Sequence, residues 1–165
     1  MSITDDLLAN NERFAAAFDL GHLPVAPARN LAIITCMDSR MDVFAMLGLE
    51  LGAAHVLRNA GGIVTDDMLR SVMISQRKLQ TRSVLLVHHT NCGMLTFTDD
   101  ELADELEAET GVTPSFPIGA FTDLDQSVRR SMERIRTSPF VPCTDDVRGC
   151  VYDVDTGRLR EISST

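Results

Sequence analysis

The sequence LAIITCMDSR, residues 31–40, joins a short apolar run to a group of polar side chains. Residues 31–35 are apolar and mostly β-branched, a composition typical of a buried strand. Cys36, Asp38 and Arg40 follow that strand directly. Reactive side chains at the end of a buried strand indicate a site at the edge of a sheet.

A second stretch of the same kind is SVLLVHHTNCGM, residues 83–94. Residues 83–87 predict another buried strand, and His89 and Cys92 follow it. With Cys36, these side chains form a set of two cysteines and one histidine, which is ligand chemistry typical of zinc. Three protein ligands leave a fourth tetrahedral position for water, a feature of catalytic zinc sites.

Strand and helix patterns alternate along the rest of the chain. Strands are predicted at 31–35, 54–58 and 83–87. Helices are predicted at 5–18, 42–47, 66–79 with Thr65 as its cap, 99–109, and from Thr122 with Asp125 at the capping-box position. A hairpin of 149–154 and 158–162 follows. This order predicts an α/β fold with a Rossmann-like, mostly parallel four-stranded sheet flanked by helices and a C-terminal antiparallel edge hairpin. A strand order of 2-1-3-(4) would place the two motif-bearing strands side by side.

The chain of 165 residues is 44% hydrophobic, which is enough for one domain with its own core. Within that domain, residues 1–29 are expected to be an N-terminal helical arm and linker. The formal net charge is −9, from 24 acidic and 15 basic residues. This balance argues against nucleic acid and against an anionic membrane surface as partners.

The N-terminus carries acidic residues where a signal peptide has basic ones, and no apolar run approaches the roughly 20 residues of a membrane helix. We therefore expect a cytoplasmic protein. Cysteines in a reducing compartment are ligands or buried thiols rather than disulfides. Cys143 and Cys150 lack a metal-like context and are expected to be small buried or loop residues.

Other chemistries of cysteine and glycine motifs fit poorly. A tyrosine-phosphatase-type loop would need an arginine six residues after Cys36, where Asp42 stands. A thioredoxin-like Cys-x-x-Cys is absent, and NAGG at residues 59–62 lacks the lysine of a phosphate-binding loop. A structural zinc site would usually have four cysteine or histidine ligands. Of the adjacent histidines, the i,i+3 spacing to Cys92 selects His89, and His88 should face the opposite side as a core residue.

Asp38 has three interpretations: a surface acid, a zinc ligand, or the acceptor of a proton from bound water. Arg40 could hold this carboxylate with two hydrogen bonds. If Asp38 binds the metal, the water position is blocked. If Arg40 draws Asp38 away, water can bind.

The motifs resemble those of the β-class carbonic anhydrases. The matching residues are Cys36-x-Asp38-x-Arg40, the run RNAGG at 58–62, and His89-x-x-Cys92-Gly93. The resemblance is strong over residues 30–98 and greatest for a compact branch with HHTNCGM and FTDD. It implies Cys36, His89 and Cys92 as Zn²⁺ ligands, Asp38 as a switchable fourth ligand, and Arg40 as the partner of Asp38.

The resemblance also implies zinc-dependent hydration of CO2 to bicarbonate by zinc-bound hydroxide, in a dimer or dimer of dimers with the N-terminal helix laid across the partner. Candidate substrate-binding residues are Asn59, Ala60, Gly61 and Gly93, because backbone N–H groups around the glycines could receive developing negative charge. Carbonyl sulfide hydrolases of the same compact branch offer an alternative, COS plus water to CO2 and H2S. A non-catalytic zinc-binding protein is a third possibility.

Overall fold

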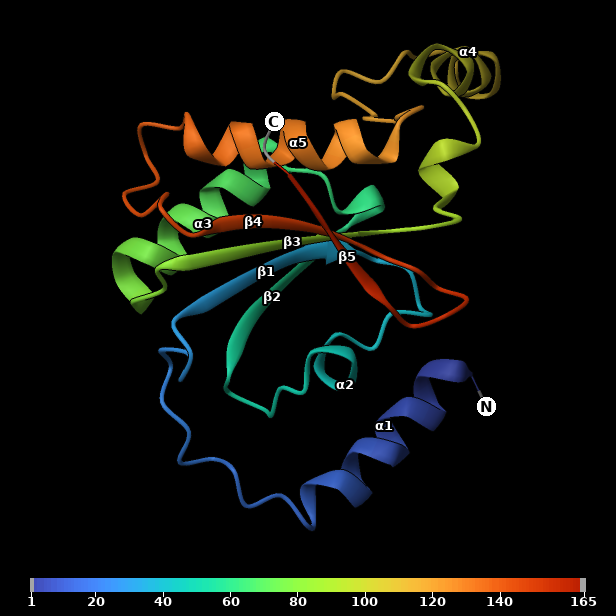
Figure 1. Ribbon diagram of the computed structural model, residues 1–165. Helices are drawn as coiled ribbons and strands as arrows, with labels where there is room; N and C mark the ends of the chain where they lie inside the picture. Colours follow the sequence, from blue (N-terminus) through green and yellow to red (C-terminus); the bar gives the residue numbers. More distant parts are fainter. Residues whose placement is uncertain (1, 164–165) are drawn as a thin grey trace.

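In the computed structural model, which describes residues 2–163, a five-stranded sheet lies at the centre of the molecule (Figure 1). Its order is β2-β1-β3-β4-β5, and only the last pair is antiparallel. The strands are β1 (Leu31–Cys36), β2 (Ala54–Asn59), β3 (Ser83–His89), β4 (Val147–Tyr152) and β5 (Leu159–Ile162). The predicted parallel sheet with an antiparallel edge hairpin is confirmed, and the first hairpin strand is itself the fourth parallel strand.

Helices cover both faces of the sheet. α3 (Asp66–Leu79) and α5 (Leu124–Arg136) pack on one face, and the short α2 (Val43–Leu47) lies on the other (Figure 1). The central strand β1 is buried on both faces, as expected for a parallel sheet between two layers. Two apolar clusters therefore meet at β1, one under α3 and α5 and one toward α2.

The starts of α1 and α5 differ from the sequence prediction, and α2 begins at Val43, after its N-cap Asp42. α1 spans Ile3–Ala15 rather than 5–18, because Ser2 forms a capping box with Asp5. α5 begins after Asp123, whose carboxylate accepts a hydrogen bond from the Gln126 N–H at 2.9 Å, so the prediction of Thr122 and a capping box was wrong. Asp125 instead forms an ion pair with Arg160 of β5.

The hairpin strands also shift by one or two residues. β4 begins at Val147, not at 149, because it pairs in parallel with β3 from Val84 onward. β1, β2 and β3 each run one or two residues further than predicted. As a result, Cys36 and His89 are the last residues of their strands rather than the first residues of loops.

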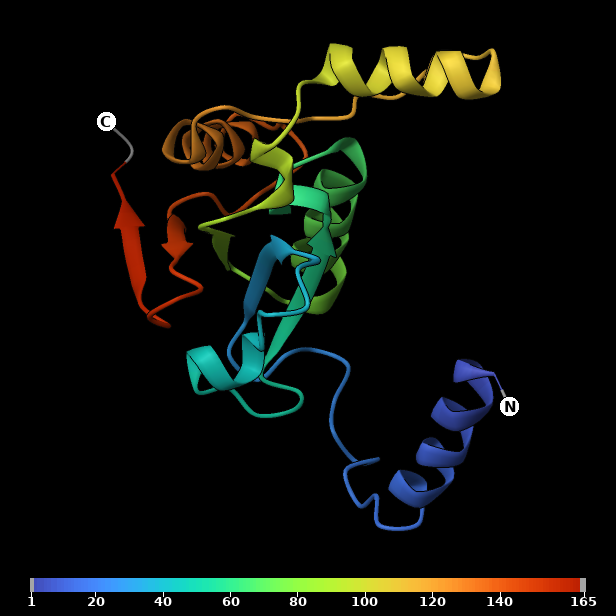
Figure 2. The same ribbon diagram turned by 90° about the vertical axis from the view of Figure 1, so that its right-hand side faces the viewer.

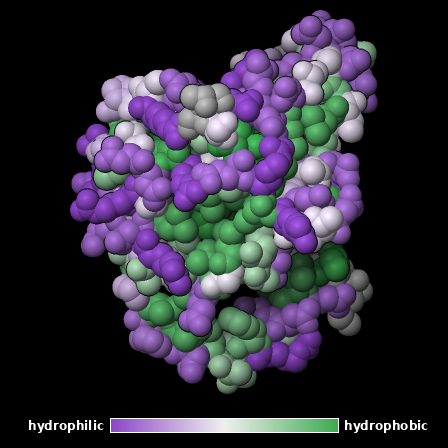
Figure 3. Space-filling model, viewed as in Figure 1, coloured by the Kyte–Doolittle hydropathy of each residue, from purple (hydrophilic) through white to green (hydrophobic). Residues whose placement is uncertain are grey.

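α1 stands apart from the rest of the molecule (Figure 2). None of its residues is buried, and its predicted apolar face is exposed, including Leu7 at 60% and Phe14 at 61%. On the face of the molecule seen in Figure 3, apolar residues also gather near the centre, and a hollow separates the α/β domain from α1. α4 (Asp99–Thr110) likewise has no buried residue. Among residues 2–163, no helix combines the length and hydrophobicity required to cross a bilayer.

Candidate metal centre

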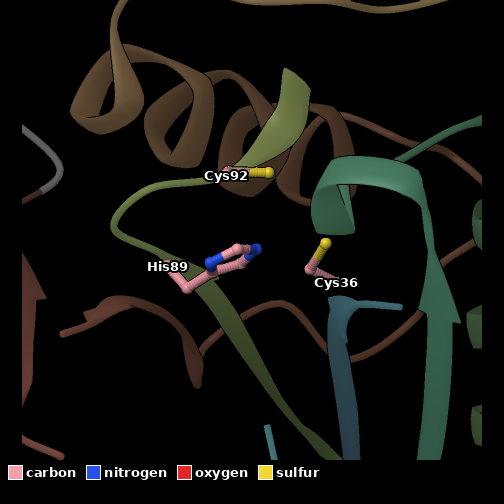
Figure 4. Close-up of side chains that lie close together, drawn as sticks. All are labelled: Cys36, His89 and Cys92. Carbon is pink, nitrogen blue, oxygen red and sulfur yellow. The ribbon is translucent and has the colours of Figure 1, made fainter. Parts of the chain in front are cut away.

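Three side chains from two neighbouring strands meet at the carboxyl edge of the sheet. Cys36 ends β1, His89 ends β3, and Cys92 follows three residues later, before the short helix η2 (Gly93–Leu95). Their sulfur and nitrogen atoms lie within 4.8 Å of one another, and all three residues are buried. Figure 4 shows the three side chains directed toward one common space.

The register of the sheet brings these residues together. β1 and β3 pair in parallel with Thr35 opposite Val87, and the Thr35 hydroxyl donates to the Val87 carbonyl at 2.7 Å. Both strands therefore end at the same level. The metal ligands expected from the sequence are thus brought together by the central strand pair.

His89 is oriented to offer one free nitrogen to this space. Its Nδ1–H donates to the carbonyl of Thr90 at 2.8 Å, because a carbonyl can only accept. Its Nε2 is buried and has no hydrogen-bond partner among the described residues. A buried, unpaired imidazole nitrogen beside two sulfurs is what a metal ion would satisfy.

The two cysteines change each other's pKa in opposite directions. The Cys92 thiol donates to the Cys36 sulfur, which lowers the pKa of Cys36 to about 4 and raises that of Cys92. The backbone N–H groups of Asp38 and Gly61 also donate to Cys36, and that of Met94 donates to Cys92. These donors stabilise negative charge on both sulfurs, as thiolate ligands require.

Arg40 holds the Asp38 carboxylate beside the cluster. The Arg40 guanidinium donates to both carboxylate oxygens, from Nε at 2.9 Å and from Nη2 at 2.7 Å, and also to the carbonyl of Asn91. These hydrogen bonds keep the pKa of Asp38 well below its usual range. One Asp38 oxygen lies 3.6 Å from His89 Nε2, but Asp38 is not part of the group of converging ligand atoms. The structure therefore presents Asp38 in the position drawn toward Arg40.

Arg58 organises the loop between the first cysteine and α2. Its guanidinium donates to the backbone carbonyls of Cys36, Asp38 and Met41, at 2.9, 2.6 and 3.2 Å. The RNAGG motif in the sequence contains Arg58 but predicts no role for it. A cation inside the strand segment that leads into this motif is the signal that could have pointed to the role.

The RNAGG loop lies directly against Cys36. Gly61 and Gly62 have positive φ values of 77° and 67°, and a Cβ on Gly62 would lie 2.8 Å from the backbone nitrogen of Cys36. The Gly61 N–H is used by the Cys36 sulfur, and the Asn59 amide donates to the Ile63 carbonyl. These groups support the cysteine, whereas Gly93 faces open space. The structure thus places Gly61 against Cys36 and leaves Gly93 beside open space.

His88 and the other two cysteines lie outside this cluster. His88 is fully buried, and burial lowers its pKa to about 4, so the prediction of a core histidine is confirmed. Cys143 and Cys150 are half-buried free thiols and do not belong to the candidate metal group. Gln76 makes two hydrogen bonds to the backbone of Cys143, which holds that loop against α3.

Comparisons with known proteins agree with this geometry. Residues 31–116 match the family described as carbonic anhydrase. The chain is 50% identical to β-carbonic anhydrase 1 of Mycobacterium tuberculosis over 99% of both proteins. It is 34% identical to a carbon disulfide hydrolase of Acidianus, over 81% of this chain and 77% of that protein. A carbonic anhydrase structure from Streptococcus mutans superposes with a TM-score of 0.92, at 43% identity over 99% of both chains.

A methyl group at Gly62 should disrupt the metal centre. Gly62→Ala would suffer both the positive φ and the clash with Cys36, and we expect a loss of more than about 2 kcal/mol of stability together with weakened metal binding. Gly48→Ala is the matched control, because its φ is 62° but its Cβ would meet nothing within 4 Å. It should cost only about 1 kcal/mol and bind metal normally. Urea unfolding and metal quantitation would reveal whether the two variants instead behave alike.

Proposed function

Because the chain belongs to the β-carbonic anhydrase family, we propose that it hydrates CO2 to bicarbonate with a Zn²⁺ ion held by Cys36, His89 and Cys92. The observation that carries the proposal is the convergence of two sulfurs and an unpaired imidazole nitrogen beside a fixed carboxylate. Its 50% identity to a β-carbonic anhydrase over nearly the whole chain supports the choice of substrate.

The donor atoms suit zinc. Two thiolates and one imidazole form a common ligand set for Zn²⁺, and the described group contains three such ligands. A Zn²⁺ ion at this position would lower the pKa of a water molecule toward neutrality. Two thiolates donate more charge than imidazoles do, so we expect activity to rise on the alkaline side.

Asp38 is proposed to orient the attacking water. Arg40 keeps its carboxylate ionised and fixed, so Asp38 can only accept a hydrogen bond from that water. Once that water has released one proton to the solvent, this bond would direct an oxygen lone pair toward the carbon of CO2, and formation of the C–O bond gives bicarbonate. The position of the Asp38 carboxylate near His89 Nε2 supports this role. The Gly93 backbone, which borders open space, is the proposed contact for a substrate oxygen.

The alternative substrate is a sulfur analogue of CO2. Relatives named carbon disulfide hydrolases support this alternative, because carbon disulfide is also a linear three-atom molecule. Carbonyl sulfide would be attacked at the same carbon by the same group. The size and polarity of the route by which substrate reaches the site, rather than the catalytic side chains, would then determine specificity.

Assays on the purified zinc-loaded protein distinguish these substrates. We expect rapid CO2 hydration, followed by stopped-flow pH indicator, and only slow H2S release from carbonyl sulfide or carbon disulfide. Fast H2S release with feeble CO2 hydration would assign the protein to the hydrolases. A fully zinc-loaded protein that is inactive on all three gases would indicate a non-catalytic zinc protein.

Two substitutions separate the role of Asp38 from metal binding. Asp38→Ala should retain zinc but lose on the order of 10²-fold in turnover, because the attacking water loses its acceptor. Cys92→Ser should lose the metal itself. Asp104→Ala, an exposed acid on α4, is the control and should leave both unchanged. Equal zinc loss in Asp38→Ala and Cys92→Ser would make Asp38 a permanent ligand instead.

Self-association is proposed to cover α1. An isolated 13-residue helix with an exposed apolar face is marginally stable in water, so its side chains require a surface to pack on. The apolar face near the arm supports a second copy of this chain as that surface. A dimer, or a dimer of dimers, would bury both apolar faces.

We place this protein in the cytoplasm, because thiolate ligands persist in a reducing compartment.

Charged substitutions on α1 test whether this helix packs on a second copy of the chain. Leu7→Glu and Phe14→Glu together put two charges on the exposed apolar face of α1 and should convert the dimer to a monomer. Ala9→Glu, on the opposite side of the same helix, should leave the assembly intact. Sedimentation equilibrium would measure the masses. A monomeric wild-type protein, or a dimer that survives the double substitution, would contradict the proposed arrangement.

A further inference from the structure

His88 lies beside the metal ligand His89 on β3 but points to the opposite face of the sheet. It is 0% exposed, and its Nε2 lies 3.1 Å from the carbonyl oxygen of Gly62. Because the carbonyl can only accept, Nε2 carries the hydrogen and donates it. The other ring nitrogen, Nδ1, is buried and has no hydrogen-bond partner within residues 2–163.

The bond from His88 ends on the loop that supports Cys36. Gly62 belongs to the short helix η1 (Ala60–Gly62), and its Cα lies so close to Cys36 that a Cβ would clash with the Cys36 backbone nitrogen. The preceding residue, Gly61, donates its N–H to the Cys36 sulfur. The loop is therefore held between an imidazole on one side and a thiolate on the other.

Phe121 lies next to both His88 and the glycine loop. Its ring lies 5.8 Å from the His88 ring at an angle of 32°, and its edge would meet a Cβ on Gly61 at 3.0 Å. The Phe121 ring therefore lies beside both the His88 ring, which donates the hydrogen bond, and the glycine loop, which accepts it.

Packing alone does not explain a histidine here. The side chains before it on the same face of β3 are Val84 and Leu86, both in the apolar core. A leucine would fill similar space without burying an unpaired Nδ1, which is costly. The hydrogen bond to Gly62 is what a histidine adds at this position.

We propose that His88 is a positioning residue for the metal centre: by holding the Gly62 carbonyl, it fixes the loop that donates the Gly61 N–H to the Cys36 thiolate. The inference rests on the proposed metal site. Hydrogen bonds around a ligand commonly change metal affinity by about 10- to 100-fold when they are lost. His88 acts through the loop and touches neither the ligand atoms nor a substrate.

Three variants test the proposal. His88→Leu removes the donor, and His88→Gln keeps an N–H donor near the position of Nε2. Leu86→Val perturbs the same buried face of β3 but leaves the His88 donor in place. In the metal-free proteins, exchange of the Gly61 amide hydrogen should be about tenfold faster or more in His88→Leu than in Leu86→Val, while His88→Gln stays close to wild type. This measurement requires neither metal nor activity.

The metal-loaded proteins supply a second readout. His88→Leu should bind Zn²⁺ about tenfold or more weakly in competition with a chelator, and the thiolate-to-metal absorption bands of its Co²⁺ form should shift. His88→Gln should restore both properties. Wild-type affinity, spectrum and amide exchange in His88→Leu would overturn the inference, as would His88→Gln behaving like His88→Leu. Failure of the wild-type protein to bind Zn²⁺ would instead overturn the proposed function.

The wild-type protein provides a test even if His88→Leu does not fold. Nitrogen NMR of the His88 ring should show hydrogen on Nε2, with scalar coupling across the hydrogen bond to the Gly62 carbonyl. Hydrogen on Nδ1, or no coupling to Gly62, would contradict the proposal.

Discussion

The parallel pairing of β1 with β3 at the middle of the sheet places Cys36 and His89 at one edge and fills both apolar layers at the same time. Ile33 and Ile34 point to opposite faces and are both fully buried. A slip of one residue in register would reverse every side chain of β1 between the two layers. The register that packs the core is therefore also the register that assembles the metal ligands, so the site and the core depend on one contact.

Around the ligands, the backbone supplies most of the electrostatic support. Buried thiolates are costly unless hydrogen bonds compensate them, and three N–H groups from separate loops approach the two sulfurs. Those loops are fixed in turn by side chains behind them, Arg58 on the loop after Cys36 and His88 on the glycine loop. Glycine is required at position 62 because its backbone touches Cys36 in a left-handed conformation. The centre thus has an inner set of ligands and an outer set of residues that hold the backbone in place.

The arm and α4 contrast with this tightly packed region. Neither helix has a buried residue, although both begin with complete capping boxes. Local capping is sufficient to define where these helices start, but it contributes only about 1 kcal/mol each. Their apolar side chains require further packing, and for α1 the proposed source is a second copy of the chain.

The local sequence determined the elements and the ligand set. Apolar β-branched runs identified the central strands, and the spacing of Cys36, His89 and Cys92 identified the candidate ligands, because both patterns depend on neighbouring residues. The sequence placed Arg40 two residues from Asp38 but left the role of Asp38 open. Tertiary structure alone decided that Arg58 spans three carbonyls of a distant loop, that the Gly61 N–H approaches the Cys36 sulfur, and that His88 reaches Gly62. The physical reason is that hydrogen bonds across the sheet, such as those from Arg58 and His88, join residues about 20 positions or more apart, and their geometry exists only when the strands have paired.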